Sequence, residues 1–319
     1  MGFQNNWQRF AARFLAQDGR IVDTGNDGVS HSEGQGWGML FALRAGDQDS
    51  FERIYAWTRR YLRRPTDRLH AWRWTPSAQG VPDDFNNATD GDIFIAAALC
   101  EAGSRWNRAE WRDSGRLIAQ DILRLLLRRV GGRIILLPGE KGFEREAGIV
   151  ANPSYYAFPM IRTLAAALPD PLWIDVVSDG LHLIRAACLG PAALPADWVT
   201  VSRRDGSVDA AADWPERFSY DAVRVPLWLY WSGMSEEPGL LGPEALWRAS
   251  ARHLPAWVNL RTAQVSPYAA PPGIEAVARL VSGDAPGRGG NAVAPLLTDT
   301  MDYYSSALIL LTQMAADER

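Results

Sequence analysis

Apolar residues recur at helical spacing along most of the chain. In ten stretches they stand three or four positions apart, as on one face of an amphipathic helix: residues 7–16, 51–62, 92–106, 111–130, 154–168, 171–189, 221–231, 244–257, 274–281 and 302–315. Short segments rich in Gly and Pro separate them. Segment 133–137, R-I-I-L-L, follows two glycines and predicts a small extended patch. Because strands and helices do not alternate, the pattern predicts an all-α fold and disfavours a doubly wound sheet or a TIM barrel.

Nothing in the pattern divides the 319 residues into parts. No long linker or change of composition interrupts the chain, so we expect a single domain over residues 1–319. The only candidate for a boundary is the Gly-rich stretch 282–290. It lacks the Lys and the spacing of a phosphate-binding loop, and we interpret it as a surface loop between the last helices.

Segment 32–39, S-E-G-Q-G-W-G-M, is the first candidate for chemistry. Ser32 and Gln35 match the capping box at a helix start, which places Glu33 in the first turn. The three glycines would let a bulky ligand approach Glu33, and Trp37 offers a flat apolar face of the kind on which sugar rings stack. A plain helix start is an equal alternative at this stage, since an acidic residue there favours the helix dipole.

Segment 86–92, N-N-A-T-D-G-D, repeats this arrangement ahead of an apolar helix. Thr89 is expected to cap the helix, with Asp90 in the first turn and Asp92 closing a reciprocal cap. One acidic residue would satisfy the dipole, but two are present. Crowded carboxylates raise one another's pKa, which serves an enzyme and is costly to a scaffold.

Segment 218–226, F-S-Y-D-A-V-R-V-P, is the third candidate. Asp221 and Arg224 are spaced to meet on one helical face. Taken alone, an i, i+3 pair of this kind is more often a structural salt bridge than part of a catalytic site.

In this order the three segments resemble glycoside hydrolase family 8, and in particular the bacterial endoglucanases associated with cellulose synthesis. The resemblance extends to residues 136–139, 142–143, 152–155, 195–199 and 303–304, and so covers almost the whole chain. Two positions depart from the family pattern. Cys100 stands where the family usually has an aliphatic residue or Gly, and a Tyr is commoner at the position of Trp37.

The resemblance implies a fold and a set of roles. The expected fold is the (α/α)6 barrel of helical hairpins with a small extended hairpin patch. Glu33 matches the family's general acid, Asp221 the general base of its largest branch, and Asp90 the acid that grips the sugar at the cleavage point. Members of this branch invert the anomeric centre. Arg224 and Tyr220, beside the base, would orient it and hold the attacking water.

The residue types agree with this chemistry independently of the resemblance. Inverting hydrolysis of a glycosidic bond needs a protonated carboxyl for the leaving oxygen and an ionised carboxylate that activates water, about 6.5–9.5 Å apart. Glu33 and Asp221 would fill these roles. Burial near Asp90 and Trp37 would keep Glu33 protonated near neutral pH.

Aromatic residues are the expected substrate contacts. Trp72 and Trp74 lie in a short segment between helical patterns, and their i, i+2 spacing points both rings to the same side of an extended chain. Most of the 14 tryptophans are expected in the core, because large rings contribute heavily to burial. The predicted substrate-binding residues are Trp37, Trp72, Trp74, Tyr155, Tyr220, Arg224 and Tyr304.

Charge and composition narrow the range of partners. A net charge of −4 and a pI near 5.7 argue against nucleic acid and anionic membranes, whereas an uncharged β-1,4-glucan fits. The histidines and cysteines lack metal-binding or redox spacing, so neither a metal nor a cofactor is expected. Cys100 and Cys188 are predicted to be buried free thiols, with a disulfide as the alternative in an exported protein.

The chain has no apolar run long enough to span a membrane. Its short polar lead before the first helix looks like the start of a chain whose leader has been removed, and the resemblance implies a periplasmic or secreted protein, with a cytoplasmic one as the alternative. The resemblance also implies action on nascent cellulose in association with a cellulose synthase complex. We expect a monomer.

Two classes of function stay open at this point. The first is an inverting endo-β-1,4-glucanase, with xylanase, mixed-linkage glucanase and chitosanase as alternatives. The second is a non-catalytic β-glucan-binding subunit, which the presence of all three carboxylates disfavours. A chitosanase would need further acids along the cleft, and Asp83 and Asp84 are candidates that could equally form a solvated turn. His31, close to Glu33, is a candidate to line the cleft, with a structural or surface role at least as well supported.

Overall fold

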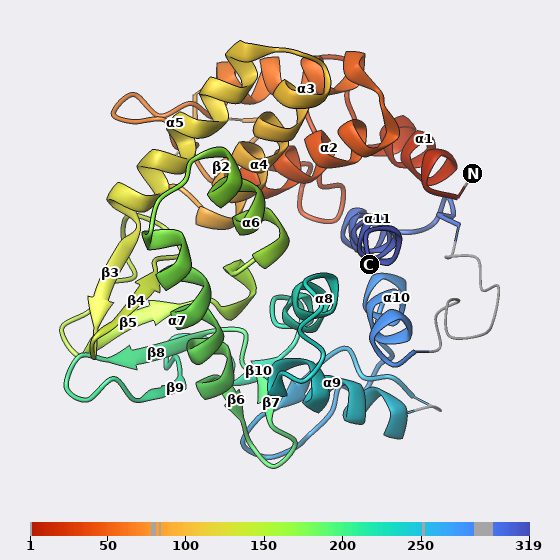
Figure 1. Ribbon diagram of the computed structural model, residues 1–319. Coiled ribbons are helices and arrows are strands. Elements are labelled where there is room, and N and C mark those ends of the chain that lie inside the picture. Colours follow the sequence, from red (N-terminus) through yellow and green to blue (C-terminus); the bar gives the residue numbers. More distant parts are fainter. Residues whose placement is uncertain (1, 78–80, 83, 251–252, 284–295) are drawn as a thin grey trace.

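Eleven α-helices make up most of the regular structure in the described part of the protein. The computed structural model describes residues 2–77, 81–82, 84–250, 253–283 and 296–319 (Figure 1). The helices are α1 (Gly2–Phe14), α2 (Ser32–Ala45), α3 (Gln48–Tyr61), α4 (Thr89–Arg105), α5 (Ala109–Leu125), α6 (Phe158–Ala167), α7 (Leu172–Ala186), α8 (Arg224–Trp231), α9 (Pro238–Ala249), α10 (Pro272–Val281) and α11 (Tyr303–Asp317).

Five helices pack as a closed ring, and a further helix packs on each of them. α2 contacts α4, α4 contacts α6, α6 contacts α8, α8 contacts α11, and α11 contacts α2. The further helices are neighbours in the chain: α3 packs on α2, α5 on α4, α7 on α6, α9 on α8, and α10 on α11 (Figure 1). α1 packs against α11 and α2, so the described helices form five neighbouring pairs and one further helix, the paired arrangement of an α/α barrel.

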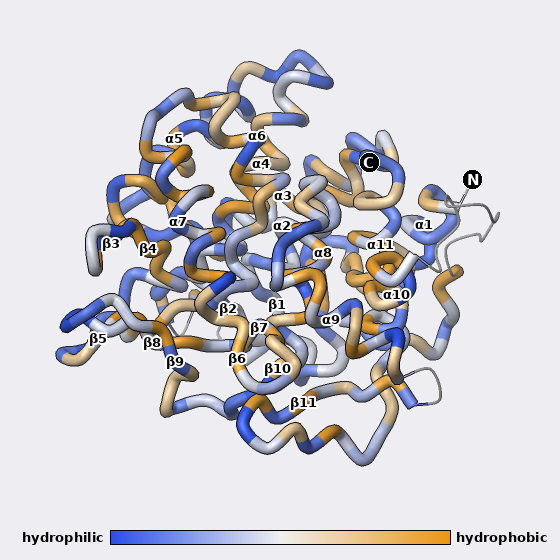
Figure 2. Tube along the Cα trace, turned by 60° about the horizontal axis from the view of Figure 1, so that its bottom comes forward, coloured by the Kyte–Doolittle hydropathy of each residue, from blue (hydrophilic) through white to orange (hydrophobic). Residues whose placement is uncertain are grey.

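The ring helices are buried nearly all round, which explains their composition. Every residue is buried over 89–100 of α4 and over 305–315 of α11. By contrast, α3 buries Phe51, Ile54, Trp57 and Thr58, whose spacing marks a single face. Hydrophobic residues along the helices are visible in Figure 2. The all-α prediction is confirmed in its helices, although short strands also occur.

The predicted cap of α2 is wrong. Ser32 is the first helical residue, and the cap is His31, whose Nδ1 accepts a hydrogen bond from the Gly34 amide. Gln35 does not turn back to the helix start. Its Oε1 accepts from the Ile21 amide and its Nε2 donates to Thr58 in the core, so partners from distant segments replace the local capping box.

The predicted cap of α4 is wrong for the same reason. The helix begins at Thr89 after Ala88, which offers no side-chain cap, and the Thr89 hydroxyl donates to the Leu137 carbonyl instead. Asp92 closes no reciprocal cap, because its carboxylate accepts from both the amide and Nδ1 of His70 and from Nδ2 of Asn87. These bonds tie the chain that precedes Trp72 to the start of α4.

Short strands lie between the helices and pair in antiparallel fashion. They are β1 (Ser30–His31) with β2 (Arg73–Trp74), β3 (Leu127–Val130) with β4 (Arg133–Leu136), β5 (Gly148–Ala151) with β8 (Val199–Ser202) and β9 (Val208–Ala210) in the order β5-β8-β9, β6 (Cys188–Leu189) with β7 (Leu194–Pro195), and β10 (Arg217–Phe218) with β11 (Val258–Asn259). The extended patch predicted at 133–137 is confirmed as half of the β3–β4 hairpin.

Several predicted helix ends are displaced. The stretch 127–130 belongs to β3, because Gly131 and Gly132 both adopt positive φ and form a tight hairpin turn. α7 ends at Ala186, before β6. α8 begins at Arg224, which leaves Asp221 in the turn before it. α9 runs from Pro238 and ends at Ala249, and it therefore starts and ends earlier than the predicted helix 244–257.

Among the described residues, no helix is long and apolar enough to cross a membrane. Of the predicted surface loop at 282–290, residues 284–290 lie outside the described part, as does Asp83.

Candidate active site

The amino ends of four ring helices bring the predicted acids together. Glu33 lies in the first turn of α2, Asp90 is the second residue of α4, Arg224 opens α8, and Tyr304 is the second residue of α11. Contacts between their side chains link segments up to 191 residues apart in sequence. The residues that sequence patterns marked as catalytic therefore form one cluster.

Arg224 is the hub of this cluster. Its guanidinium binds Glu33 Oε1 through Nη1, and through Nη2 it donates to Asp221 Oδ1 at 2.7 Å and to the Ser154 hydroxyl at 3.0 Å. Its side chain is only 5% exposed, so the charge depends on these partners. Glu33 and Asp221 raise the pKa of Arg224 above its ordinary value, against the effect of burial. One guanidinium thus holds the two carboxylates at a fixed separation.

Asp90 is buried beside Glu33. Its Oδ1 accepts a hydrogen bond from the Gly91 amide at 2.8 Å. Burial and the neighbouring charge of Glu33 raise the pKa of Asp90 well above its usual range, while Arg224 opposes the shift.

Asp221 is held by both of its oxygens. Arg224 binds Oδ1, and the indole Nε1 of Trp198 donates to Oδ2 at 3.0 Å. Burial raises the pKa of Asp221, and the guanidinium of Arg224 lowers it. The side chain is 33% exposed, so solvent can reach an oriented carboxylate.

Asp197 and Trp198 are functional candidates that sequence reasoning missed. Asp197 is buried, and its carboxylate accepts from the amides of Ser219 and Ala222 and from the Ser219 hydroxyl, on both sides of Asp221. Burial and Asp221 raise the pKa of Asp197 from 3.8 to about 7. Both residues lie in segment 195–199, which is part of the family resemblance, and this was the signal in the sequence that could have found them.

Three tyrosines close around the carboxylates. Burial, together with Asp90, Asp221 and Glu33, raises the pKa of Tyr155 well above its usual value, so its phenol stays neutral. The Tyr304 hydroxyl donates to the Tyr220 carbonyl at 2.7 Å, and the two rings meet edge to face at 5.5 Å. The ring of Tyr220 is exposed to solvent beside Asp221.

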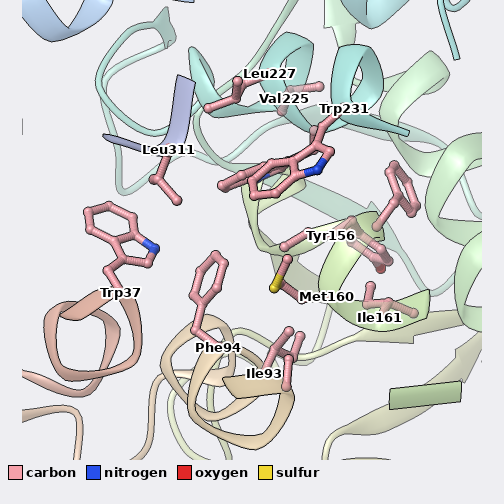
Figure 3. Packing of buried hydrophobic residues seen from close by; sticks show 14 of the residues in the cluster. Trp37, Ile93, Phe94, Tyr156, Met160, Ile161, Val225, Leu227, Trp231 and Leu311 are labelled. Carbon is pink, nitrogen blue, oxygen red and sulfur yellow. The ribbon is translucent and has the colours of Figure 1, made fainter. Parts of the chain in front are cut away.

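Trp37 does not offer a face to sugar, and this prediction is wrong. The side chain is 1% exposed and packs edge to face against Phe94 at 5.9 Å (Figure 3). The guanidinium of Arg224 lies 5.7 Å from its ring centre. The ring therefore supports the site from inside the core, because the inward face of α2 carries it.

The glycines around Glu33 serve helix packing, contrary to the expectation that they open a path for ligand. A Cβ at Gly34 would lie 2.6 Å from the Tyr303 hydroxyl, one at Gly36 2.6 Å from Cβ of Phe94, and one at Gly38 2.8 Å from Ile21. All three positions face neighbouring protein, so the missing side chains let α2 approach its neighbours closely.

The two tryptophans of the segment 69–74 have different surroundings. Trp72 is 37% exposed, and its Nε1 donates to Asp84 Oδ2 at 2.9 Å, which leaves ring surface available to a ligand. Trp74 packs edge to face on Trp57 at 5.6 Å, with the guanidinium of Arg20 4.9 Å from its ring centre. Trp74 is mainly a packing residue in this arrangement.

The histidines and cysteines take no part in a metal centre within the described residues. No group of three or more His, Cys, Asp or Glu side chains there could hold a metal ion. His31 caps α2 and contacts Asp23, and His70 is buried against Asp92. Cys100 and Cys188 are free, and burial raises the pKa of both thiols.

Comparisons with known proteins agree with this site. Residues 2–318 match glycosyl hydrolases family 8. The chain belongs to this family. A probable endoglucanase from Novacetimonas hansenii is 42% identical over 313 residues, 98% of this chain and 90% of that protein. An endoglucanase from Cellulomonas uda is 38% identical over 283 residues, 88% of this chain and 78% of that protein.

A solved structure of this kind extends the likeness to the fold. The endo-β-1,4-glucanase CMCax from Acetobacter xylinum is 42% identical, has a TM-score of 0.92, and is matched over 99% of this chain and 98% of its own. The (α/α)6 barrel of family 8 is thereby confirmed for this chain. The match to family 8 also spans every helix that contributes to the carboxylate cluster.

Proposed function

We propose that the protein is an inverting endo-β-1,4-glucanase that hydrolyses cellulose-type β-glucan. The observation that carries the proposal is the guanidinium of Arg224, which binds Glu33 and Asp221 at once, with Asp90 buried nearby. Full-length relatives named endoglucanases support the polymer and its linkage. An uncharged glucan also suits a chain with a net charge of −4.

Glu33 acts as the general acid. It gives a proton to the glycosidic oxygen as the bond from the anomeric carbon to that oxygen breaks. Burial and the charge of Glu33 raise the pKa of the adjacent Asp90 and favour its protonated form, which can supply this proton to Glu33. Asp90 in addition holds the sugar at the cleavage point.

Asp221 acts as the general base. It takes a proton from a water whose oxygen bonds to the anomeric carbon on the face opposite the leaving oxygen, so a β-linkage gives an α-product. Arg224 and Trp198 each donate to its carboxylate and favour the ionised form that the step requires. Tyr220 lies next to it in the chain and helps to hold the attacking water.

Aromatic rings at the edge of the cluster contact the glucan. Trp72 and Tyr220 expose ring surface, and Tyr304 packs on Tyr220. Tyr155 presents a neutral hydroxyl beside the carboxylates. Stacking on exposed rings and hydrogen bonds to hydroxyl groups are the two means by which a protein recognises an uncharged sugar.

We further propose, on the strength of the family resemblance, that the enzyme acts on nascent cellulose in association with a synthase complex. On the same resemblance, we propose the periplasm or the outside of the cell as the place of the reaction. Xylan, mixed-linkage glucan and chitosan hydrolysis, and glucan binding without hydrolysis, are the competing outcomes of the test below.

The test is the release of new reducing ends from carboxymethylcellulose, xylan, mixed-linkage glucan and chitosan by the protein and by its Glu33→Gln variant. We expect fastest release from carboxymethylcellulose. Without the acid, kcat should fall roughly 10²–10⁴-fold while glucan binding persists. The control is Glu236→Gln, because Glu236 is exposed and is not one of the cluster residues. This variant should keep full activity.

Unimpaired hydrolysis by Glu33→Gln would remove Glu33 from the mechanism. Fastest release from another polymer would assign that polymer as the substrate. Binding without release from any of the four would leave the glucan-binding function in its place.

A further inference from the structure

The carboxylate of Asp221 accepts a hydrogen bond from Trp198, a residue that lies outside the helical ring. Trp198, which donates to Asp221 Oδ2 at 3.0 Å, directly precedes β8 of the small three-stranded sheet. Trp198 is itself anchored, because its carbonyl accepts from the Ala211 amide at 3.0 Å. The second donor to Asp221, Arg224, belongs to the helical ring. Two independent parts of the fold therefore fix one carboxylate.

The indole of Trp198 has little freedom to turn. Its ring is stacked on Trp214, with centroids 4.8 Å apart and planes inclined by 16°, and on Phe143, at 5.9 Å and 6°. Tyr155 meets it edge to face at 6.1 Å. With two nearly parallel aromatic neighbours, the ring of Trp198 is confined, and the direction of its N–H bond is set by packing.

Asp197 fixes the backbone that carries the base. Its Oδ1 accepts from the amide of Ser219 at 3.0 Å and from that of Ala222 at 2.8 Å, and its Oδ2 accepts from the Ser219 hydroxyl. Ser219 and Ala222 stand on either side of Asp221 in sequence. The amide of Asp197 in turn donates to the Arg217 carbonyl at 2.8 Å. This buried carboxyl thus closes the turn before α8.

We propose that Asp197 and Trp198 are positioning residues for the general base: Trp198 sets the direction of the Asp221 carboxylate, and Asp197 sets the backbone that presents it. The proposal rests on the proposed role of Asp221. Both residues act through Asp221, since the N–H of Trp198 binds its carboxylate and the buried Asp197 binds the backbone on either side of it.

The role has a signature in the pH dependence of kcat. The N–H of Trp198 favours the ionised form of Asp221 and lowers its pKa, as does Arg224, whereas burial and Glu33 raise it. Without the N–H, the pKa of Asp221 rises. Because the base works only when ionised, activity on the acid side is then lost at a higher pH than in the unchanged protein. A loss of packing that leaves the hydrogen bond from Trp198 to Asp221 intact does not move this limb.

The decisive variant is Trp198→Phe, which keeps a ring in the stack and removes the N–H. We expect kcat on carboxymethylcellulose to fall about 10- to 100-fold with KM little changed, and the acid limb to move to higher pH. The control is Trp7→Phe. Trp7 also donates from Nε1 to an aspartate oxygen, Asp47 Oδ2, at 2.9 Å, but Asp47 lies just beyond the carboxyl end of α2, whereas Glu33 lies at its amino end.

An unchanged kcat and acid limb in Trp198→Phe, as in Trp7→Phe, would overturn the role of Trp198. If Trp198→Phe does not fold, Trp214→Ala takes its place, since it removes one face of the stack and leaves the N–H present. It should move the acid limb in the same direction, and an unmoved limb would again count against the proposal.

Asp197 is tested by a pair of variants. Asn can still accept both backbone amides through its oxygen, whereas Ala can accept neither. We therefore expect Asp197→Ala to lower kcat about 10-fold or more and Asp197→Asn to restore most of it. Equal kcat values for the two variants would overturn the role of Asp197.

Asp221→Asn, measured alongside, separates this inference from the function on which it rests. Full activity in Asp221→Asn would mean that the assignment of the base is wrong. A dead Asp221→Asn together with an unaffected Trp198→Phe would leave the base in place and refute only its positioning by Trp198.

Discussion

Arg224 shows how the site is held together at the scale of single residues. A guanidinium this deeply buried needs anionic partners, and Glu33 and Asp221 supply them. The same contact keeps both carboxylates in fixed positions, although the proposed acid must carry a proton when it acts. Asp90 addresses this conflict, because its raised pKa favours a protonated carboxyl close to Glu33.

The sequence predicted which acids meet but not what surrounds them. Glu33, Asp90 and Arg224 stand at helix starts and Asp221 stands in the turn before one. That they act together was implied by the family resemblance, since the predicted caps of α2 and α4 are wrong. The contacts of Asp197 could not be predicted, since its donors at 219–222 come near only when the small sheet and α8 have formed.

The prediction that Trp37 stacks on sugar is wrong for a related reason. A tryptophan in the first turns of a helix can face either a ligand or the core, and sequence does not say which. Here the indole packs on Phe94, which belongs to the neighbouring helix α4. Only the packing of α2 on α4 decides that the indole is buried.

Asp197 also makes a prediction for stability. Its pKa is raised from 3.8 to about 7 by burial and by Asp221. Between these values the unfolded chain loses the proton while the folded protein keeps it, so the contribution of Asp197 to stability is full at low pH, falls as pH rises towards 7, and is constant above. Asn has no proton to lose.

We therefore expect the free energy of unfolding of Asp197→Asn, relative to the unchanged protein, to increase between about pH 4 and about pH 7. Urea denaturation of both proteins across this range measures the difference. Asp113→Asn, an exposed acid on α5, should show no such trend. A difference that is constant with pH would contradict the raised pKa.

At the scale of elements, the contact between α2 and α4 determines the geometry of the acids. Gly91 in α4 has no room for a Cβ, which would lie 2.7 Å from the Glu33 amide nitrogen, and Gly36 of α2 faces Phe94 and Ile95. These glycines let the starts of the two helices touch, so that Glu33 and Asp90 meet. The sequence showed the glycines but not what they face.

Gly36→Ala tests this contact. In an exposed helix the change would stabilise by about 1 kcal/mol. Here the added methyl group meets Cβ of Phe94 at 2.6 Å and the Ile95 amide nitrogen at 3.1 Å, and we expect a loss of about 1–3 kcal/mol together with lower kcat. Thermal and urea denaturation measure the loss. Gly2→Ala is the control, because nothing lies nearer than 3.9 Å to the added methyl group, and it should not lower the free energy of unfolding. A Gly36→Ala protein as stable as this control would contradict the close contact.

At the scale of the whole molecule, the helical ring and the small sheet contribute different residues to the site. The ring supplies the acid, the base and the guanidinium from the starts of α2, α4 and α8. The sheet supplies the residues that we propose position the base. Helical periodicity predicted most of the helices, whereas closure of the ring came from the family resemblance, because periodicity does not encode which helices pack together. The single domain over residues 1–319 stays a prediction.

The central claim is that Glu33 and Asp221 hydrolyse a β-glucan by inversion, and the anomeric form of the first products tests it most directly. Proton NMR of a soluble β-1,4-glucan during the first minutes of hydrolysis distinguishes the α-anomer from the β-anomer before the two equilibrate. We predict that the α-anomer appears first, and that Asp221→Asn releases neither at a comparable rate, while Asp113→Asn matches the unchanged protein. Initial release of the β-anomer would contradict the account.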